Sequence, residues 1–167
     1  MRMSAGKLQR LQRVAWPNGV IAAAAMDQRG SLQKSIAKEK GISPDAVPAE
    51  MMSELKTAVT RVLTPHASVI LLDPEYGLEA IRVKAPKAGV LLAYEQTGDD
   101  QTQPGRIPSM ILDWTVRKTI AAGADALESL RRAMEMNPAN ERQLPRNLDF
   151  DCLKNTAVAV VHRSPLF

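Results

Sequence analysis

Short apolar runs, each followed by a longer stretch of helical or turn character, constrain the fold of this chain more than any other feature. The runs lie at 19–26 (GVIAAAAM), 68–72 (SVILL) and 89–93 (GVLLA), and each has the length of a buried strand. Continuous apolar runs without polar alternation are typical of parallel strands that are covered on both faces. Helical segments between such strands are the usual crossover connections. The sequence therefore predicts an α/β fold built on a parallel sheet.

The clearest helix is predicted at 48–63. Pro48 suits the first turn of a helix, and Pro65 ends the pattern. A stripe at a spacing of three to four residues is expected to face the core. Its members are Met51, Met52, Leu55, Val59, Val62 and Leu63. A second, short helix is expected at 78–84.

The pattern becomes less regular in the second half of the chain. A long polar loop is expected at 98–108, and a helix at 110–122. The fourth strand should follow from Ala124 onward, although ALESL at 126–130 is a poor strand sequence. A further short strand is predicted at 156–162 (TAVAVVH). The chain is therefore predicted to alternate strands and helices and to end in an irregular tail.

The charge of the chain admits two kinds of anionic partner. The net charge is +4, which fits either a polyanion or small phosphorylated substrates. Four cations near the start are predicted to form a solvated end: Arg2, Lys7, Arg10 and Arg13. Aromatic residues make up only 4% of the chain, which leaves few rings to stack bases, and no nucleic-acid-binding motif accompanies the charge. Nucleic acid is therefore not expected as a partner.

The cysteine content and the hydropathy pattern predict a soluble cytoplasmic protein. Cys152 is the only cysteine, which excludes an internal disulfide and a cysteine-based zinc site. A turn at 17–19 interrupts the apolar segment 14–26 that could be mistaken for a signal-peptide core. No run approaches the ~20 apolar residues that a membrane helix needs, so no membrane partner is expected.

Polar side chains follow the ends of all three predicted strands. They are Asp27, Gln28 and Arg29 after the first, Asp73 and Glu75 after the second, and Glu95 after the third. In a parallel barrel such positions converge on one mouth, where active sites are built. Carboxylates there can bind hydroxyls or move protons, and the planar fork of an arginine suits phosphate. Polar residues also simply mark where a strand leaves the core, so no single position decides between the two readings.

Five segments together resemble the tagatose-bisphosphate aldolase family, which is the DeoC/LacD type of class I aldolase. In chain order they are GVIAAAAMDQRGSL at 19–32, LTPHASVILLDPEYGL at 63–78, LLAYEQTG at 91–98, IPSMILDW at 107–114 and AGADA at 122–126. The likeness covers roughly residues 7–127. It implies a (β/α)8 TIM barrel, here a truncated partial barrel of about four β/α units, because a complete barrel needs about 250 residues.

The same resemblance implies a lyase that needs neither a metal nor a cofactor. Such an enzyme forms a Schiff base between a lysine and the ketose carbonyl, and it cleaves the C3–C4 bond to give glycerone phosphate and glyceraldehyde 3-phosphate. The residues carried over are Asp27 as the catalytic acid, Gln28 and Arg29 as ligands of substrate hydroxyls or phosphate, and Asp73, Glu75 and Glu95 as supporting groups. Tagatose, fructose and sulfosugar substrates stay open.

The likeness stops in the fourth strand. In the family, a lysine that points into the site follows GADA and one apolar residue, but here Leu127 is followed by Glu128. This glutamate reverses the charge beside Asp27. No lysine of this chain is expected to form the Schiff base. The remaining candidates lie on predicted helices or connections away from the mouth: Lys84, Lys87 and Lys118.

The chain is therefore expected to comprise the N-terminal half of an aldolase barrel at 1–127 and a divergent tail at 128–167. A reading-frame shift and a genuine short homologue that assembles with a partner both explain the tail. The protein is expected to be catalytically incomplete and to self-associate through open strand edges. The alternative function is a non-catalytic sugar-phosphate-binding or interaction module. Of the two histidines, His66 is expected to pack or cap after a helix, and His162 has no assigned role.

Overall fold

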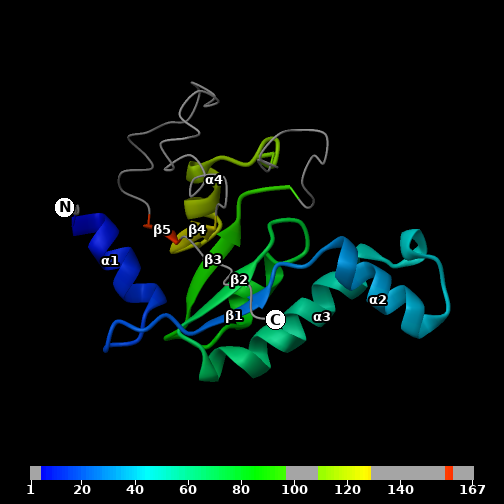
Figure 1. Cartoon of the computed structure of the whole chain (residues 1–167), viewed down its shortest axis with the longest axis horizontal. Coiled ribbons are helices and arrows are strands. Elements are labelled where there is room, and N and C mark those ends of the chain that lie inside the picture. The colour runs from blue at the N-terminus through cyan, green and yellow to red at the C-terminus, as the bar shows by residue number, and fades with distance from the viewer. Residues whose placement is uncertain (1–4, 97–108, 129–156, 160–167) are drawn as a thin grey trace, which may run out of the picture.

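Five parallel strands form one sheet in a computed structural model that describes residues 5–96, 109–128 and 157–159 (Figure 1). The strands are β1 (Ala23–Met26), β2 (Val69–Leu72), β3 (Gly89–Ala93), β4 (Ala126–Glu128) and β5 (Ala157–Ala159). Their order in the sheet is the order of the chain. A sheet wound in one direction only is of the barrel type, because a doubly wound sheet reverses its strand order. The partial α/β barrel is confirmed, and the further strand predicted at 156–162 joins the same sheet as β5.

Helices connect the strands and cover the sheet. The α-helices are α1 (Ala5–Val14), α2 (Gly30–Lys40), α3 (Ala49–Leu63) and α4 (Val116–Ala121), and the 3₁₀ helices are η1 (Pro44–Ala46), η2 (Thr64–His66) and η3 (Glu79–Val83). In Figure 1, α2 and α3 lie on the β1 side of the sheet, and α1 lies on the side of β4 and β5. None of the described helices is long and apolar enough to cross a membrane.

The apolar runs are continuous because both faces of the central strands are buried. One face carries Val69, Leu71 and Leu91, which pack against Val14 of α1. The alternate residues, Ile70, Leu72, Val90 and Leu92, pack on the other side against η3 and the segment around α4. The period of two along each strand therefore serves two separate apolar clusters, as the parallel-sheet prediction requires.

The register aligns the ends of the strands. Met26 pairs with Leu72, and Leu72 pairs with Leu92, so β1, β2 and β3 leave the sheet at nearly the same level. We call this the carboxyl end of the sheet and the opposite side its amino end. The polar residues that follow the three strands therefore share one end of the sheet, as the sequence predicted.

The first helix corrects the expectation of a solvated basic terminus. Val14 is fully buried at the amino end of the sheet. Arg10 donates a hydrogen bond of 3.0 Å to the carbonyl of Ala124, and Arg13 forms an ion pair with Asp125. Two of the four cations thus attach α1 to the start of β4. The charge count alone missed this because both partners lie far along the chain.

The core face of α3 also differs from the predicted stripe. Its buried residues are Met52, Lys56 and Thr60, at a spacing of four, whereas Val62 and Leu63 are 68% and 38% exposed. The prediction was wrong at these two positions because it admitted only apolar residues to the core. A buried lysine with an ion-pair partner takes one of the central places instead.

Other boundaries shift for local reasons. The helix predicted at 110–122 begins only at Val116, where the hydroxyl of Thr115 accepts the Lys118 N–H at 3.2 Å. Upstream of the cap, Asp113 has a left-handed φ of 61°, which a helix cannot include. The first strand is shorter than its apolar run, and the predicted helix at 78–84 is the 3₁₀ helix η3.

Three smaller expectations remain. His66, predicted to pack or to cap, lies in η2 and is exposed, so a packing role is wrong. The strand predicted at 156–162 is described as β5, which pairs with β4. The polar loop at 98–108 and most of the predicted tail lie outside the described residues.

Candidate active site at the carboxyl end of the sheet

Three polar side chains follow β1 in succession. We call the segment that directly follows a strand, at the carboxyl end of the sheet, the exit of that strand. Asp27 is half-buried and Gln28 is exposed. Arg29 crosses to the exit of β3, where its Nη2 donates to the carbonyl of Glu95 at 2.7 Å. The Nε of Arg29 is buried and has no hydrogen-bond partner among the described residues. This guanidinium therefore links two strand exits and leaves one buried donor without a partner at the carboxyl end of the sheet.

The exit of β2 is a tight turn organised by Asp73. Its Oδ1 accepts the backbone N–H groups of Glu75 and Tyr76 at 3.0 and 2.8 Å. Gly77 closes the turn, and a Cβ there would lie 2.5 Å from the Asp73 carbonyl oxygen. Asp73 is fully buried. Its carboxylate therefore holds the turn and does not face the open end of the sheet.

The other oxygen of Asp73 binds a lysine that the sequence motifs did not include. Lys56 of α3 is fully buried, and its Nζ lies 2.6 Å from Asp73 Oδ2. The same Nζ donates to the carbonyls of Met26 and Gln28 at 2.6 and 2.7 Å. A signal for this residue was present in the sequence, since Lys56 stands four residues from Met52 on the face that packs. The predicted stripe left Lys56 out because it included apolar residues only.

The two remaining acids occupy different surroundings. Glu95 is buried and forms an isolated antiparallel bridge with Met110. Glu75 is exposed and interacts with the neighbouring phenol. The hydrogen bond with Glu75 raises the pKa of Tyr76 to about 12, with smaller contributions from burial and from the charge of Glu75. Glu75 is thus directed to Tyr76, while Glu95 belongs to the exit of β3.

The three lysines considered as Schiff-base candidates have other surroundings. Lys84 precedes β3 at the amino end, where its Nζ donates to the carbonyl of Ala88 at 2.6 Å, and burial lowers its pKa. Lys87, in the same segment, lies 5.6 Å from the ring centroid of Trp16. Lys118 lies on α4 and donates to the carbonyl of Asp113. Among the described residues, no group of three or more His, Cys, Asp or Glu is placed to hold a metal ion.

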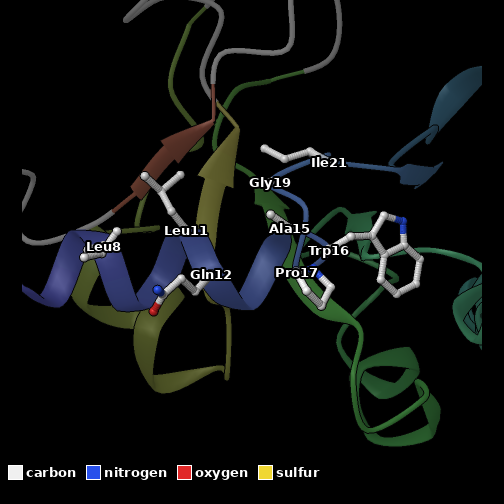
Figure 2. A pocket seen from close by; sticks show the side chains of 8 residues that line it. All are labelled: Leu8, Leu11, Gln12, Ala15, Trp16, Pro17, Gly19 and Ile21. Atoms are coloured by element: carbon white, nitrogen blue, oxygen red, sulfur yellow. The ribbon is translucent and has the colours of Figure 1, made fainter.

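A pocket of about 510 Å³ opens at the amino end of the sheet, between α1 and the segment that leads into β1 (Figure 2). Its lining is Leu8, Leu11, Gln12, Ala15, Trp16, Pro17, Gly19 and Ile21. None of these side chains carries a charge. Recognition of a phosphate is strongest with cationic side chains, and this lining has none, so the pocket is not the candidate active site.

Comparison with known proteins gives one consistent family. The family profile described as "DeoC/LacD family aldolase" matches residues 21–148. Tagatose 1,6-diphosphate aldolase 2 of Enterococcus faecalis is 45% identical over 130 residues, which are 78% of this chain and 38% of that protein. Tagatose 1,6-diphosphate aldolase 2 of Streptococcus mutans is also 45% identical, over 78% of this chain and 39% of its own length. Tagatose 1,6-diphosphate aldolase 1 of Streptococcus pyogenes serotype M3 is 44% identical over the same shares. The chain spans less than half the length of these relatives.

Proposed function

This chain belongs to the DeoC/LacD family of aldolases. From that premise we propose that the carboxyl end of its sheet contributes the residues that the N-terminal half of a class I aldolase supplies to a site for phosphorylated ketoses. The observation that carries the proposal is Arg29, which joins the exits of β1 and β3 and retains an unpartnered Nε there. Asp27 and Gln28 flank it on the same loop. These groups supply the charge and hydrogen bonds that a sugar phosphate requires.

The proposed reaction is retro-aldol cleavage of a ketose 1,6-bisphosphate. A lysine amine adds to the C2 carbonyl and water leaves, which produces an iminium ion. A base takes the C4 hydroxyl proton, the C3–C4 bond breaks, and its electron pair moves into the iminium to form an enamine. Glyceraldehyde 3-phosphate departs. Protonation at C3 and hydrolysis then release glycerone phosphate and the free lysine.

In this scheme Asp27 exchanges protons with the reacting groups, and Gln28 and Arg29 bind hydroxyls or phosphate. Asp73, Glu75 and Glu95 support the loops that carry them. We propose tagatose 1,6-bisphosphate as the substrate because the relatives carry that name, with fructose and sulfosugar analogues as the alternatives.

We propose that the chain cannot complete this reaction alone. The lysine that does reach the carboxyl end of the sheet, Lys56, is fully buried, donates to two backbone carbonyls and forms an ion pair with Asp73. A Schiff base requires a neutral amine with a free lone pair. The nucleophile is therefore proposed to come from a partner chain.

Borohydride trapping tests this claim directly. Purified chain is incubated with glycerone phosphate and sodium borohydride, and intact-mass spectrometry measures reduced adducts. The expected result is no stoichiometric adduct and no turnover of tagatose or fructose 1,6-bisphosphate above background. One adduct on a single lysine would refute the incompleteness.

Ligand binding tests the site itself and separates it from the non-catalytic alternative. Glycerone phosphate should bind the chain, and Arg29→Ala should weaken binding about tenfold or more, since a hydrogen bond to a charged group contributes ~1.5–3 kcal/mol. Arg82→Ala is the matched control, because that arginine pairs with Glu79 on the exposed surface of η3. Equal affinities for the two variants would remove Arg29 from the site. Binding by the chain without turnover, in any assembly, would favour the sugar-phosphate-binding module.

We also propose a cytoplasmic protein that self-associates through its β1 side. Within the described residues, β1 is paired only with β2, and Ala23 and Ala25 are exposed. Val20 and Ile21, which lead into the strand, are 53% and 46% exposed. A second copy can cover this edge and the adjoining apolar pocket. Light scattering should report an oligomer that Ile21→Lys shifts toward monomer, and a compact wild-type monomer stable for days would refute it.

A further inference from the structure

We propose that Lys56 is a positioning residue for the candidate site: from α3, its ammonium holds the backbone on both sides of Asp27 and so sets where the Asp27 and Gln28 side chains meet a ligand. The inference rests on the proposed function and adds to it a residue outside the strand-exit motifs. Its basis is the simultaneous binding of Met26, Gln28 and Asp73 by one buried nitrogen.

Lys56 makes two hydrogen bonds and one ion pair through a single nitrogen. Its Nζ donates to two carbonyl oxygens at 2.6 and 2.7 Å, and Oδ2 of Asp73 lies 2.6 Å from the same nitrogen as an ion-pair partner. Two of these oxygens are the carbonyls of Met26 and Gln28, and the residue between them is Asp27. The loop that begins the candidate site is therefore attached at two points to a helix of the outer layer.

An apolar residue could fill the same space but could not replace these bonds. Met26 ends β1 and Gln28 lies beyond the strand, so the carbonyls at this exit need a donor from outside the sheet. Burying an ammonium is unfavourable unless it is paired and hydrogen-bonded. Asp73 supplies the charge, and the same carboxylate organises the exit of β2. One ion pair thus couples the first two strand exits to each other.

A nucleophilic role does not fit the same geometry. Lys56 lies on α3 and is 0% exposed. Its ammonium reaches the strand exits from within the packed interior. A substrate carbonyl would have to displace Asp73 and both backbone oxygens before it reached the amine. Lys56 therefore acts through the loop it holds.

The test compares Lys56→Met, Lys56→Met/Asp73→Asn and the control Ser68→Ala. The double variant removes the carboxylate charge that the single variant leaves unpaired. Its asparagine amide keeps an oxygen for the turn N–H groups, so the double variant folds even if the single variant does not. Ser68→Ala destabilises the sheet at its amino end and leaves the carboxyl end intact. Two measurements are made on the full chain: backbone ¹⁵N order parameters without ligand, and the dissociation constant of glycerone phosphate.

If Lys56 positions the loop, the order parameters of Gln28 and Arg29 fall from about 0.85 to below about 0.6 in the double variant, while those of β3 stay unchanged. The dissociation constant rises about tenfold, because the ligand must now order the loop. Ser68→Ala changes neither quantity. Unchanged loop order in the double variant would overturn the inference, whatever its stability. If wild-type chain does not bind glycerone phosphate, the proposed function fails, and the order parameters still decide whether Lys56 holds the loop.

Discussion

Ser68 provides a sharp test of how the amino end of the sheet is held together. The residue directly precedes β2 and is 1% exposed. Its hydroxyl donates to the carbonyl of Val14 at 2.8 Å and accepts the N–H of Ala22 at 2.9 Å. The end of α1 and the approach to β1 therefore meet on one side chain. Ser68→Ala removes both bonds and changes little else in volume.

The expected cost follows from the groups left behind. A buried donor or acceptor without a partner costs ~1–3 kcal/mol. The carbonyl of Val14 belongs to a fully buried residue, whereas Ala22 is half-buried and its N–H can recover water. We therefore expect Ser68→Ala to lower the free energy of unfolding by about 1–3 kcal/mol, with the carbonyl contributing most.

Urea denaturation followed by tryptophan fluorescence measures this difference, and Ser35→Ala is the matched control. The Ser35 hydroxyl is exposed and donates to Ser31 of its own helix at 3.1 Å. Its removal should change the free energy of unfolding by less than ~0.5 kcal/mol. If the two substitutions cost the same, the bridge at Ser68 contributes no net stability and the reasoning is wrong.

Two further predictions concern packing and titration. Gly89→Ala should lower the free energy of unfolding by about 1–3 kcal/mol in the same urea assay, because a Cβ there would lie 2.5 Å from the carbonyl oxygen of Arg13. Gly30→Ala is the control: its Cβ would meet nothing within 4 Å, so its effect should be nearly neutral. Tyr76 should ionise near pH 12 in an ultraviolet titration, and Glu75→Gln should bring that midpoint closer to 10, the ordinary pKa. Because folding raises the pKa, this contribution to stability is complete below about pH 10 and is lost as the pH rises toward 12; a midpoint unmoved by Glu75→Gln would refute the assignment.

The strands were predictable because their signal is local. Uninterrupted apolar runs bounded by turn residues mark the positions of β2 and β3, and parallel pairing places their ends together. The start of α4 was not predictable in this way. It depends on the left-handed backbone of Asp113 and on the bridge between Glu95 and Met110. That bridge joins two segments that only the folded chain brings together.

In the candidate site, too, features with a local sequence signal were predictable and contacts between distant segments were not. Strand exits could be predicted to share one end of the sheet, since that follows from parallel pairing alone. The residues that contact each strand exit could not be predicted from the sequence, because the buried ion pair of Lys56 and Asp73 joins a helix to a strand exit. Asp73 was expected among the supporting groups, and the structure gives it a specific set of contacts within the turn. The unbroken periodicity around Lys56 was the one clue that a charged residue belonged inside.

The one-directional order of the strands has a consequence for how the chain can fold as it is synthesised. Each strand pairs with the strand made just before it, so the sheet can grow at one side while the ribosome is still working. Helix α1 is the exception. It is made before any of the five strands, yet the surface against which Val14 packs includes β3, which is made much later. Until then only the β2 part of that surface, Val69 and Leu71, is available, and the apolar face of α1 stays partly uncovered while two strands are completed.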